Sequence, residues 1–482
     1  MSSLVITIFG ASGDLTFRKL IPAIFQLYKK NLLPESFTII GFARKEWNKA
    51  GFVEFLNNNI DKSEFNESDT LLWEEFSKHL SYISSDFNNA IGYTALADII
   101  KHIESQNEKT TKLFYLSTSP EYFKTIAEQI NLSELSLICR NDTLARIIVE
   151  KPYGTSLQNV IDTDMELRKT FSEEHIYRID HYLGKESVQN ILVFRFANSL
   201  FDKLWNNEHI EWIQIKVNEK LGVENRGPYF DNAGAIKDMV QNHILQVLSI
   251  VTMEVPNSQD PADIQKNRLN IIKNIDFFSN KEEDFIKGQY EGYLKELGVN
   301  ENSITETYAF LKLKLNIDKW NGVPIYVRTG KKLSTKLSEI NIKFKDGDNN
   351  YFDKIVGNVN NILSFRIQPD EGISLMILTK KPGEKDILTP VSLDFCYKPL
   401  FNNIADSYVG LLKNIIDGDQ SLFASIDEII AQWGIMEKIE KRNNSTIYTY
   451  NQNSDGPEIV KTTMGKNNVE WVDNKSYTCS IK

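Results

Sequence analysis

The sequence predicts an α/β protein of two domains, the first built on a parallel sheet and the second, larger one on a mainly antiparallel sheet. Its 482 residues are more than a single hydrophobic core usually organises. Up to about residue 178, buried-type strands are followed by helical patterns, whereas later strands alternate without regular intervening helices. We therefore expect an N-terminal domain over 1–178 and an α+β domain over 179–482.

Composition restricts the partners that this chain can have. The formal net charge is −10, which disfavours nucleic acid and anionic membrane surfaces. The chain has no apolar run long enough to span a membrane, and its first residues lead directly into a strand without a basic leader. Anionic small ligands remain possible where cations are gathered locally.

The cysteines suggest a compartment and exclude one kind of site. Three cysteines, Cys139, Cys396 and Cys479, are widely spaced and odd in number. This pattern argues for a reducing, cytoplasmic location and against a disulfide framework or a zinc site. We expect no bound metal.

A glycine loop follows the first predicted strand. Leu4–Phe9 is apolar and of strand length, residues 10–15 read Gly-Ala-Ser-Gly-Asp-Leu, and a helical pattern extends to about residue 30. A strand, a glycine turn and a helix N-terminus form the first unit of a Rossmann-type dinucleotide-binding domain, where the helix N-terminus receives a pyrophosphate. A glycine turn without a ligand is the alternative. The candidate coenzyme contacts are Gly10, Ser12, Gly13, Asp14 and Leu15.

The end of the second strand indicates which dinucleotide is bound. Thr38–Phe42 is followed by Arg44 and Lys45, and Glu46 comes one residue too late to accept from a ribose hydroxyl. An arginine at this position holds the 2′-phosphate of NADP, whereas a carboxylate selects NAD. The sequence therefore predicts NADP, with a merely solvated arginine as the alternative.

Two further strands complete the predicted parallel sheet. Lys112–Ser117 contains Tyr115, a further candidate coenzyme contact, and Ala145–Glu150 leads into Lys151. Ligands bind beyond the carboxyl ends of such strands, so Lys151 can reach coenzyme and substrate together. A lysine that only precedes a helix is the alternative.

Residues 178–186 read Arg-Ile-Asp-His-Tyr-Leu-Gly-Lys-Glu and concentrate polar chemistry. The imidazole of His181, the phenol of Tyr182 and the ammonium of Lys185 can donate to one phosphate. Asp180 can instead accept a proton or orient a histidine. The alternative is a solvated charged segment.

The second domain offers a candidate base on a predicted helix, Ala233–Met253. Its His243 is accompanied by Asp238, Asn242 and Gln246 on an otherwise apolar pattern, and an imidazole titrates near neutrality. A histidine that only hydrogen-bonds in the core is the alternative. Predicted strands of this domain are Glu211–Val217, Ala309–Ile317, Asn341–Lys345 and Ser364–Gln368.

Several of these motifs resemble glucose-6-phosphate dehydrogenases. Residues 178–186 match that family's substrate-binding signature at every position. The glycine loop, Glu-Lys-Pro-Tyr-Gly at 150–154 and Asp-x-x-x-Asn-His at 238–243 are similar to its coenzyme and catalytic motifs. The resemblance extends from about Leu4 to Trp433.

The resemblance implies an activity and a set of roles. It implies oxidation of glucose 6-phosphate at C1 with reduction of NADP⁺, the first step of the oxidative pentose phosphate pathway, by a homodimer or a dimer of dimers. It assigns the general base to His243 and its orientation to Asp180. It assigns substrate binding to Lys151, His181, Tyr182, Lys185, Glu219, Asp238, Lys331 and Lys336.

Some family members hold a second, structural NADP, and the sequence argues against one here. Arg366, Gln368 and Asp394 match positions of that site, but Leu337 and Met376 stand where those members have lysines.

Two rival functions remain. Another Rossmann-type sugar oxidoreductase would share the Glu-Lys-Pro segment but lack the phosphate-binding nonapeptide. A catalytically silent NADP-binding regulator on the same fold would be expected to lose His243 or Asp180, and this chain has both.

Overall fold

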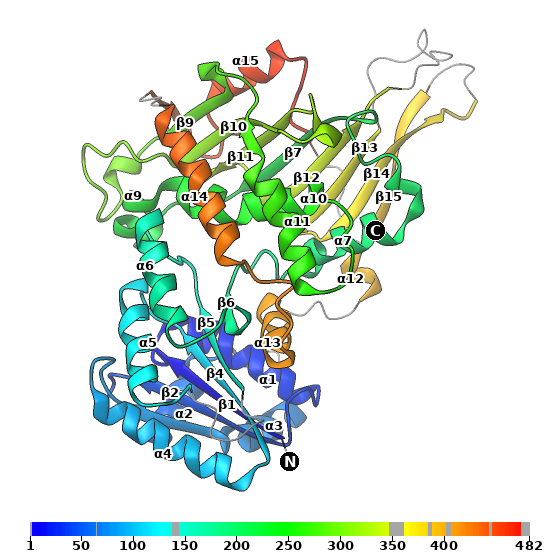
Figure 1. Ribbon diagram of the computed structural model, residues 1–482. Coiled ribbons are helices and arrows are strands. Elements are labelled where there is room, and N and C mark those ends of the chain that lie inside the picture. The colour runs from blue at the N-terminus through cyan, green and yellow to red at the C-terminus, as the bar shows by residue number, and fades with distance from the viewer. Residues whose placement is uncertain are drawn as a thin grey trace. The chain divides into compact units, whose positions relative to one another are not determined.

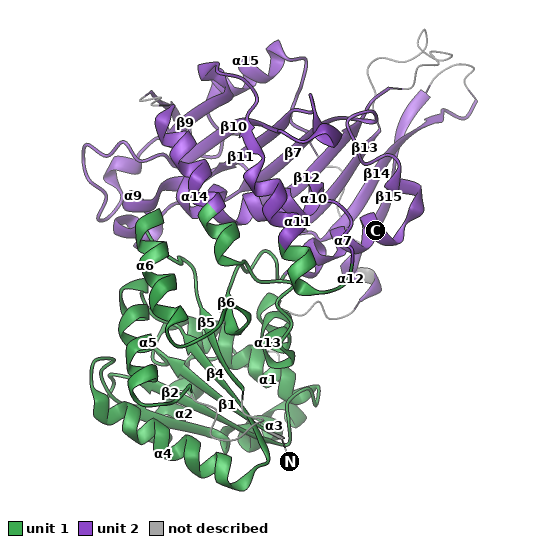
Figure 2. Cartoon of the chain, viewed as in Figure 1, with its two compact units in different colours: residues 1–184, 258–265, 405–430 green, residues 185–257, 266–404, 431–482 purple. Residues whose placement is uncertain are grey.

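The computed structural model describes residues 2–63, 65–136, 144–346, 361–383, 388–401, 406–442 and 446–473. The chain divides into two compact units (Figure 2). Unit 1 comprises 1–184, 258–265 and 405–430, and unit 2 comprises 185–257, 266–404 and 431–482. The sequence prediction placed the boundary at residue 178 and gave every later residue to the second domain. The difference arises because a late helix, α13 (Ser407–Asp417), packs against α1 (Ile21–Lys29) of the first unit.

Unit 1 is built on a six-stranded sheet, and all its paired strands run parallel (Figure 1). The strand order is β3-β2-β1-β4-β5-β6, so β1 lies between β2 and β4. This confirms the parallel, Rossmann-type sheet that the sequence predicts. The strands are β1 (Ser2–Phe9), β2 (Ser36–Ala43), β3 (Leu80–Ser84), β4 (Lys109–Leu116), β5 (Leu144–Val149) and β6 (Ile176–Arg178).

Helices and an aromatic cluster complete unit 1. Phe9 and Phe42 on adjacent strands contact each other, and both contact Tyr93 of the helix α4. Rings of this size supply much of the apolar area that stabilises the sheet. Besides α1 and α13, the helices are α2 (Lys49–Asn59), α3 (Glu67–Ser77), α4 (Ala90–Gln106), α5 (Phe123–Leu132) and α6 (Leu157–Arg168).

Unit 2 is built on a ten-stranded, mainly antiparallel sheet, as the sequence predicts. The order is β15-β14-β13-β12-β7-β11-β10-β9-β16, with β8 paired to β10. The pairs β7–β11 and β9–β16 are parallel. The strands are β7 (Ile210–Asn218), β8 (Ile275–Phe277), β9 (Phe285–Tyr290), β10 (Tyr308–Leu315), β11 (Ile325–Gly330), β12 (Leu337–Phe344), β13 (Ile362–Gln368), β14 (Gly372–Lys380), β15 (Leu388–Cys396) and β16 (Ile447–Tyr450).

The helices of unit 2 include a π-helical segment that contains the candidate base. This segment, η5 (Ile236–Ile244), joins α9 (Gly227–Ala235) to α10 (Leu245–Thr252), where the sequence predicts one continuous helix. The others are α7 (Glu186–Ala197), α8 (Ser199–Asp202), α12 (Tyr397–Leu400) and α15 (Glu458–Lys466). Two more, α11 (Pro261–Lys273) and α14 (Ile426–Lys441), begin in unit 1 and end in unit 2.

Two expectations from composition have different outcomes. Cys396, at the end of β15, is disulfide-bonded, so the expectation of reduced thiols is wrong for this residue, and the cysteines no longer argue for a reducing compartment. Cys139 and Cys479 lie outside the described residues. Among the described residues, no helix has the length and apolarity needed to cross a bilayer.

Arg178 begins the charged nonapeptide but belongs to the framework of unit 1. Its side chain is 2% exposed, and its guanidinium bonds Asp164 of α6 at 2.5 Å and Glu173 at 2.8 Å. It also lies 5.0 Å from the centre of the Tyr153 ring, within the range of a cation–π contact. Arg178 therefore ties β6 to α6.

Removing this cation is predicted to destabilise the fold. In Arg178→Met the carboxylates of Asp164 and Glu173 lose their buried cation and keep only the partly exposed Arg168, so we expect the free energy of unfolding to fall by about 3 kcal/mol. Urea denaturation measures the change. The matched control is Arg168→Met, because Arg168 bonds the same Asp164 and Glu173 from a position that is 42% exposed. A loss below about 1 kcal/mol is expected there, and equal losses in the two variants would contradict this role for Arg178.

Candidate active site

The glycine loop forms a cradle that side chains would fill. Gly10 leaves β1 with a φ of +85°, and its N–H donates to the Phe42 carbonyl of β2 at 2.8 Å. A Cβ at this position would lie 2.2 Å from the Ser117 carbonyl oxygen beyond β4. The N–H of Gly13 donates back to the Gly10 carbonyl, which closes the turn before α1 and its preceding helical segment. Such a bare backbone at a helix start fits a dinucleotide pyrophosphate.

Neighbouring residues complete this loop. Asp14 is exposed and forms an ion pair with Arg18 at 2.8 Å. Ser12, Gly13 and Leu15 are half-buried. Thr16 is buried, and its N–H donates to the Gly13 carbonyl at 3.2 Å.

Two cations follow β2 beside this loop. Arg44 and Lys45 are both exposed, and they come directly after the strand whose Phe42 bonds Gly10. The Tyr82 hydroxyl fixes the turn by donating to the carbonyls of Ala43 at 3.1 Å and Lys45 at 2.9 Å. Burial raises the pKa of Tyr82 to about 12, so it stays a donor at neutral pH.

Lys151 and Asp180 follow adjacent strands, β5 and β6. Val149 pairs with Arg178 in the ladder, and the Ile179 N–H donates to the Val149 carbonyl at 3.0 Å. The peptide bond after Lys151 is cis. Lys151 and Asp180 therefore leave the same edge of the sheet, as the sequence predicts for ligand-binding residues in this fold.

The Asp180 segment is a tight turn. Asp180 is buried, and its Oδ1 accepts the Tyr182 N–H at 2.9 Å. His181 is half-buried, Tyr182 is buried, and their ring centres are 5.1 Å apart. The turn thus places the carboxylate, imidazole and phenol of the nonapeptide close together.

Tyr115 is more deeply buried than most of the other predicted coenzyme contacts. It is 1% exposed, and its hydroxyl donates to the Glu150 carboxylate at 2.5 Å. Burial, and then the charge of Glu150, raise the pKa of Tyr115 well above its usual value. The phenol is directed at the residue before Lys151, a partner that the sequence pattern does not predict.

His243 lies on η5, whose N-terminus contacts a residue far along the chain. Gly234 has a φ of +68°, and a Cβ there would lie 2.3 Å from Oε1 of Glu306. The same oxygen accepts the Ile236 N–H at 3.0 Å. Glu306 therefore caps the start of η5 beside the kink at Gly234, and π-helical segments of this kind are frequent at functional sites.

The π-helical geometry brings two predicted site residues, Asp238 and His243, to the same side of η5. His243 is 1% exposed and Asp238 is 8% exposed. They are five residues apart, which is the i to i+5 spacing of π-helical hydrogen bonding, so they lie one turn apart on one side of η5.

Other substrate candidates in unit 2 form pairs that the sequence did not predict. Lys331, after β11, bonds Glu219, after β7, at 2.5 Å and lies 4.9 Å from the centre of the Phe230 ring. Lys185 donates to the Gln368 side chain at 3.0 Å. The resemblance matches Gln368 to the second, structural NADP site, but in the structure its side-chain oxygen accepts a hydrogen bond from Lys185.

A cavity of about 1060 Å³ borders three positions that match the second, structural NADP site of some family members, Leu337, Arg366 and Gln368. Its lining includes Lys336, Leu337, Arg366, Gln368 and Trp471. Arg366 is buried and lies 3.4 Å from the sulfur of Cys396.

The other second-site positions, Asp394 and Met376, lie on β15 and β14. Asp394 accepts a hydrogen bond from the Ser392 hydroxyl at 2.8 Å.

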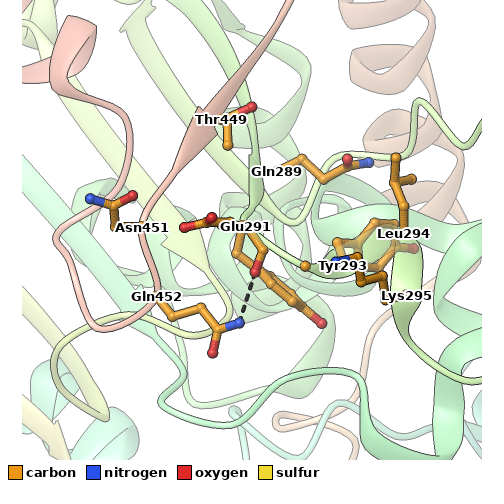
Figure 3. A pocket seen from close by; sticks show the side chains of 10 residues that line it. Gln289, Glu291, Tyr293, Leu294, Lys295, Thr449, Asn451 and Gln452 are labelled. Carbon is orange, nitrogen blue, oxygen red and sulfur yellow. Dashed lines mark hydrogen bonds between the residues drawn. The ribbon is translucent and has the colours of Figure 1, made fainter.

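A cavity of about 660 Å³ lies beside β9 and β16 and contains none of the predicted site residues. The Gln452 amide donates there to the Glu291 carbonyl (Figure 3).

The sheet, glycine loop and strand-end cations of unit 1 define a Rossmann-type dinucleotide-binding protein. The models of two families match nearly the whole chain: "Glucose-6-phosphate dehydrogenase, NAD binding domain" over 7–190 and "Glucose-6-phosphate dehydrogenase, C-terminal domain" over 192–472. The chain therefore belongs to the glucose-6-phosphate dehydrogenase family.

Individual relatives agree with this assignment. The chain is 38% identical to a glucose-6-phosphate 1-dehydrogenase of Chlamydia muridarum, covering 90% of this chain and 89% of that one. It is 37% identical to one of Streptococcus pneumoniae, covering 98% and 97%. A solved glucose-6-phosphate dehydrogenase in complex with its substrate glucose 6-phosphate matches with a TM-score of 0.90 and 33% identity over 98% of both chains. A Mycobacterium avium structure matches with a TM-score of 0.84 and 30% identity, over 97% of this chain and 98% of that one.

Proposed function

We propose that this protein oxidises D-glucose 6-phosphate at C1 to 6-phospho-D-glucono-1,5-lactone and reduces NADP⁺ to NADPH, the first step of the oxidative pentose phosphate pathway. The observation that carries the proposal is the match over 98% of the chain to a glucose-6-phosphate dehydrogenase solved with glucose 6-phosphate. The nonapeptide at 178–186 supports the same substrate, because its His181, Tyr182 and Lys185 offer three donors to a phosphate.

The proposed chemistry divides between proton and hydride. The C1 hydroxyl loses its proton to the base, for which we propose His243, oriented by Asp180. Bound NADP⁺ supplies the acceptor for the hydride that leaves C1. Glu219, Asp238, Lys331 and Lys336 are proposed to bind the sugar, and Lys151 to bind both sugar phosphate and coenzyme.

We further propose that the coenzyme is NADP rather than NAD, because Arg44 and Lys45 are exposed cations beside the glycine loop. The loop residues Gly10, Ser12, Gly13, Asp14 and Leu15 are proposed to hold the pyrophosphate. Tyr115 stays a proposed coenzyme contact, and we propose that its hydroxyl also acts through Glu150. We propose a homodimer or a dimer of dimers in the cytoplasm, with no metal.

A direct assay separates this function from its rivals. The purified chain mixed with NADP⁺ and glucose 6-phosphate is expected to develop the absorbance of NADPH at a rate far above that with unphosphorylated glucose. Equal rates with the two sugars would favour a different sugar oxidoreductase. NADP⁺ binding without any turnover would favour a silent regulator.

Arg44→Ala is predicted to weaken NADP⁺ binding selectively. The variant removes a charge-assisted contact to the 2′-phosphate, worth about 1.5–3 kcal/mol, and NAD⁺ has no such phosphate. Titration of both coenzymes measures the difference. Similar losses for NADP⁺ and NAD⁺ would show that Arg44 does not recognise the 2′-phosphate.

His243→Asn is predicted to lower kcat by about 10²–10⁴-fold, the usual contribution of a general base. The Kd of glucose 6-phosphate should change only a few-fold, because basicity acts mainly in the transition state. Steady-state kinetics and calorimetric titration give the two values. A variant that melts earlier yet keeps its kcat would make His243 a structural residue.

A further inference from the structure

The N-terminal half of α13, with its N-cap Asp406, contacts three separate segments of unit 1. Lys19, just after the glycine loop, bonds Asp406 at 2.7 Å. A Cβ on Gly184 of the nonapeptide would lie 2.7 Å from the Leu411 side chain. The Tyr408 hydroxyl donates to the Glu150 carboxylate at 3.1 Å. The first two turns of a helix from late in the chain thus contact residues at or next to three motifs of unit 1: the glycine loop, Lys151 and the nonapeptide.

Glu150 is the contact with the most direct chemical consequence. Its Oε1 accepts from the hydroxyls of Tyr115 and Tyr408, and its Oε2 lies 3.3 Å from the N–H of Lys151, which donates to it. The carboxylate therefore has protein donors on both oxygens, and one of them is the backbone of Lys151.

The protonation states suit this arrangement. Burial raises the pKa of Glu150, and its three hydrogen bonds act in the opposite direction. Burial, and then the charge of Glu150, raise the pKa of Tyr408, so the phenol remains a donor at neutral pH. The pKa of Tyr115 is raised in the same way, so both phenols keep their protons and donate hydrogen bonds to the carboxylate.

We propose that Glu150, held by Tyr115 and by Tyr408 of α13, is a positioning residue for Lys151. This inference rests on the proposed function, in which Lys151 binds both the sugar phosphate and the coenzyme. The backbone of Lys151 is anchored by the carboxylate of the preceding residue, and that carboxylate is fixed from two sides. Loss of one phenol leaves Glu150, and with it Lys151, with more than one orientation.

The test combines Tyr408→Phe with Lys151→Ala. Tyr408→Phe removes one hydroxyl, and we expect kcat/KM for glucose 6-phosphate to fall by about 10–100-fold, as for a misplaced binding group. The melting temperature should change little, whereas the Kd of NADP⁺ should rise, because Lys151 is proposed to bind the coenzyme as well. In the Lys151→Ala background the same substitution should cost nothing further, because the residue through which it acts is gone.

Two more variants sharpen the comparison. Glu150→Gln keeps the size of the side chain but turns an amide donor towards groups that donate, so a larger loss of kcat/KM is expected than for Tyr408→Phe. Tyr93→Phe is the matched control: Tyr93 is buried in the same unit and its hydroxyl donates to the Phe87 carbonyl at 3.0 Å. Its kcat/KM should remain within about twofold of the wild type.

Two results would overturn the positioning role. One is an equal loss from Tyr408→Phe with and without Lys151, and the other is a lower melting temperature with unchanged kcat/KM. Failure of the wild-type chain to oxidise glucose 6-phosphate is a different result, because it would remove the proposed function itself.

Discussion

The common direction of the strands in the first sheet is the constraint on which the site of unit 1 depends. Because all six strands run parallel, each one ends at the same edge. Gly10, Arg44, Lys151 and Asp180 follow four of these strands, β1, β2, β5 and β6. The order reverses at β1, which lies between β2 and β4, and such a reversal leaves room for a ligand beyond the strand ends. Motifs far apart in sequence share one edge for this reason.

The sequence predicted those parts of the fold in which local pattern and burial agree. β1, β2, β4 and β5 are long apolar runs and were found, whereas β3 and β6 span only five and three residues and were missed. The helix predicted over 233–253 is kinked at Gly234, where Glu306 accepts the Ile236 N–H, and the nine residues Ile236–Ile244 are π-helical. Neither a contact across about seventy residues nor the change from α- to π-helical hydrogen bonding leaves a trace in helical periodicity, so the sequence does not predict them.

The candidate site was predictable in residue types but not in partners. Motif matches identified Lys331 and Glu219 separately, and only the structure pairs them. Arg178 looked like one more cation of a phosphate-binding segment, yet it is buried against Asp164 and Glu173. Cys396 was expected to be a free thiol and is disulfide-bonded. Partner choice depends on which distant segments pack together, and a linear pattern does not encode that directly.

The division of the chain has a consequence for any attempt to dissect this protein. The backbone passes between the units five times, after residues 184, 257, 265, 404 and 430. A fragment ending near residue 178 therefore omits α13, which supplies Tyr408 to Glu150 and whose Leu411 lies against Gly184. Neither unit is a continuous module that could be exchanged between relatives by a single crossover. Recombination within this family would preserve both units only if the exchanged segments were chosen in sets.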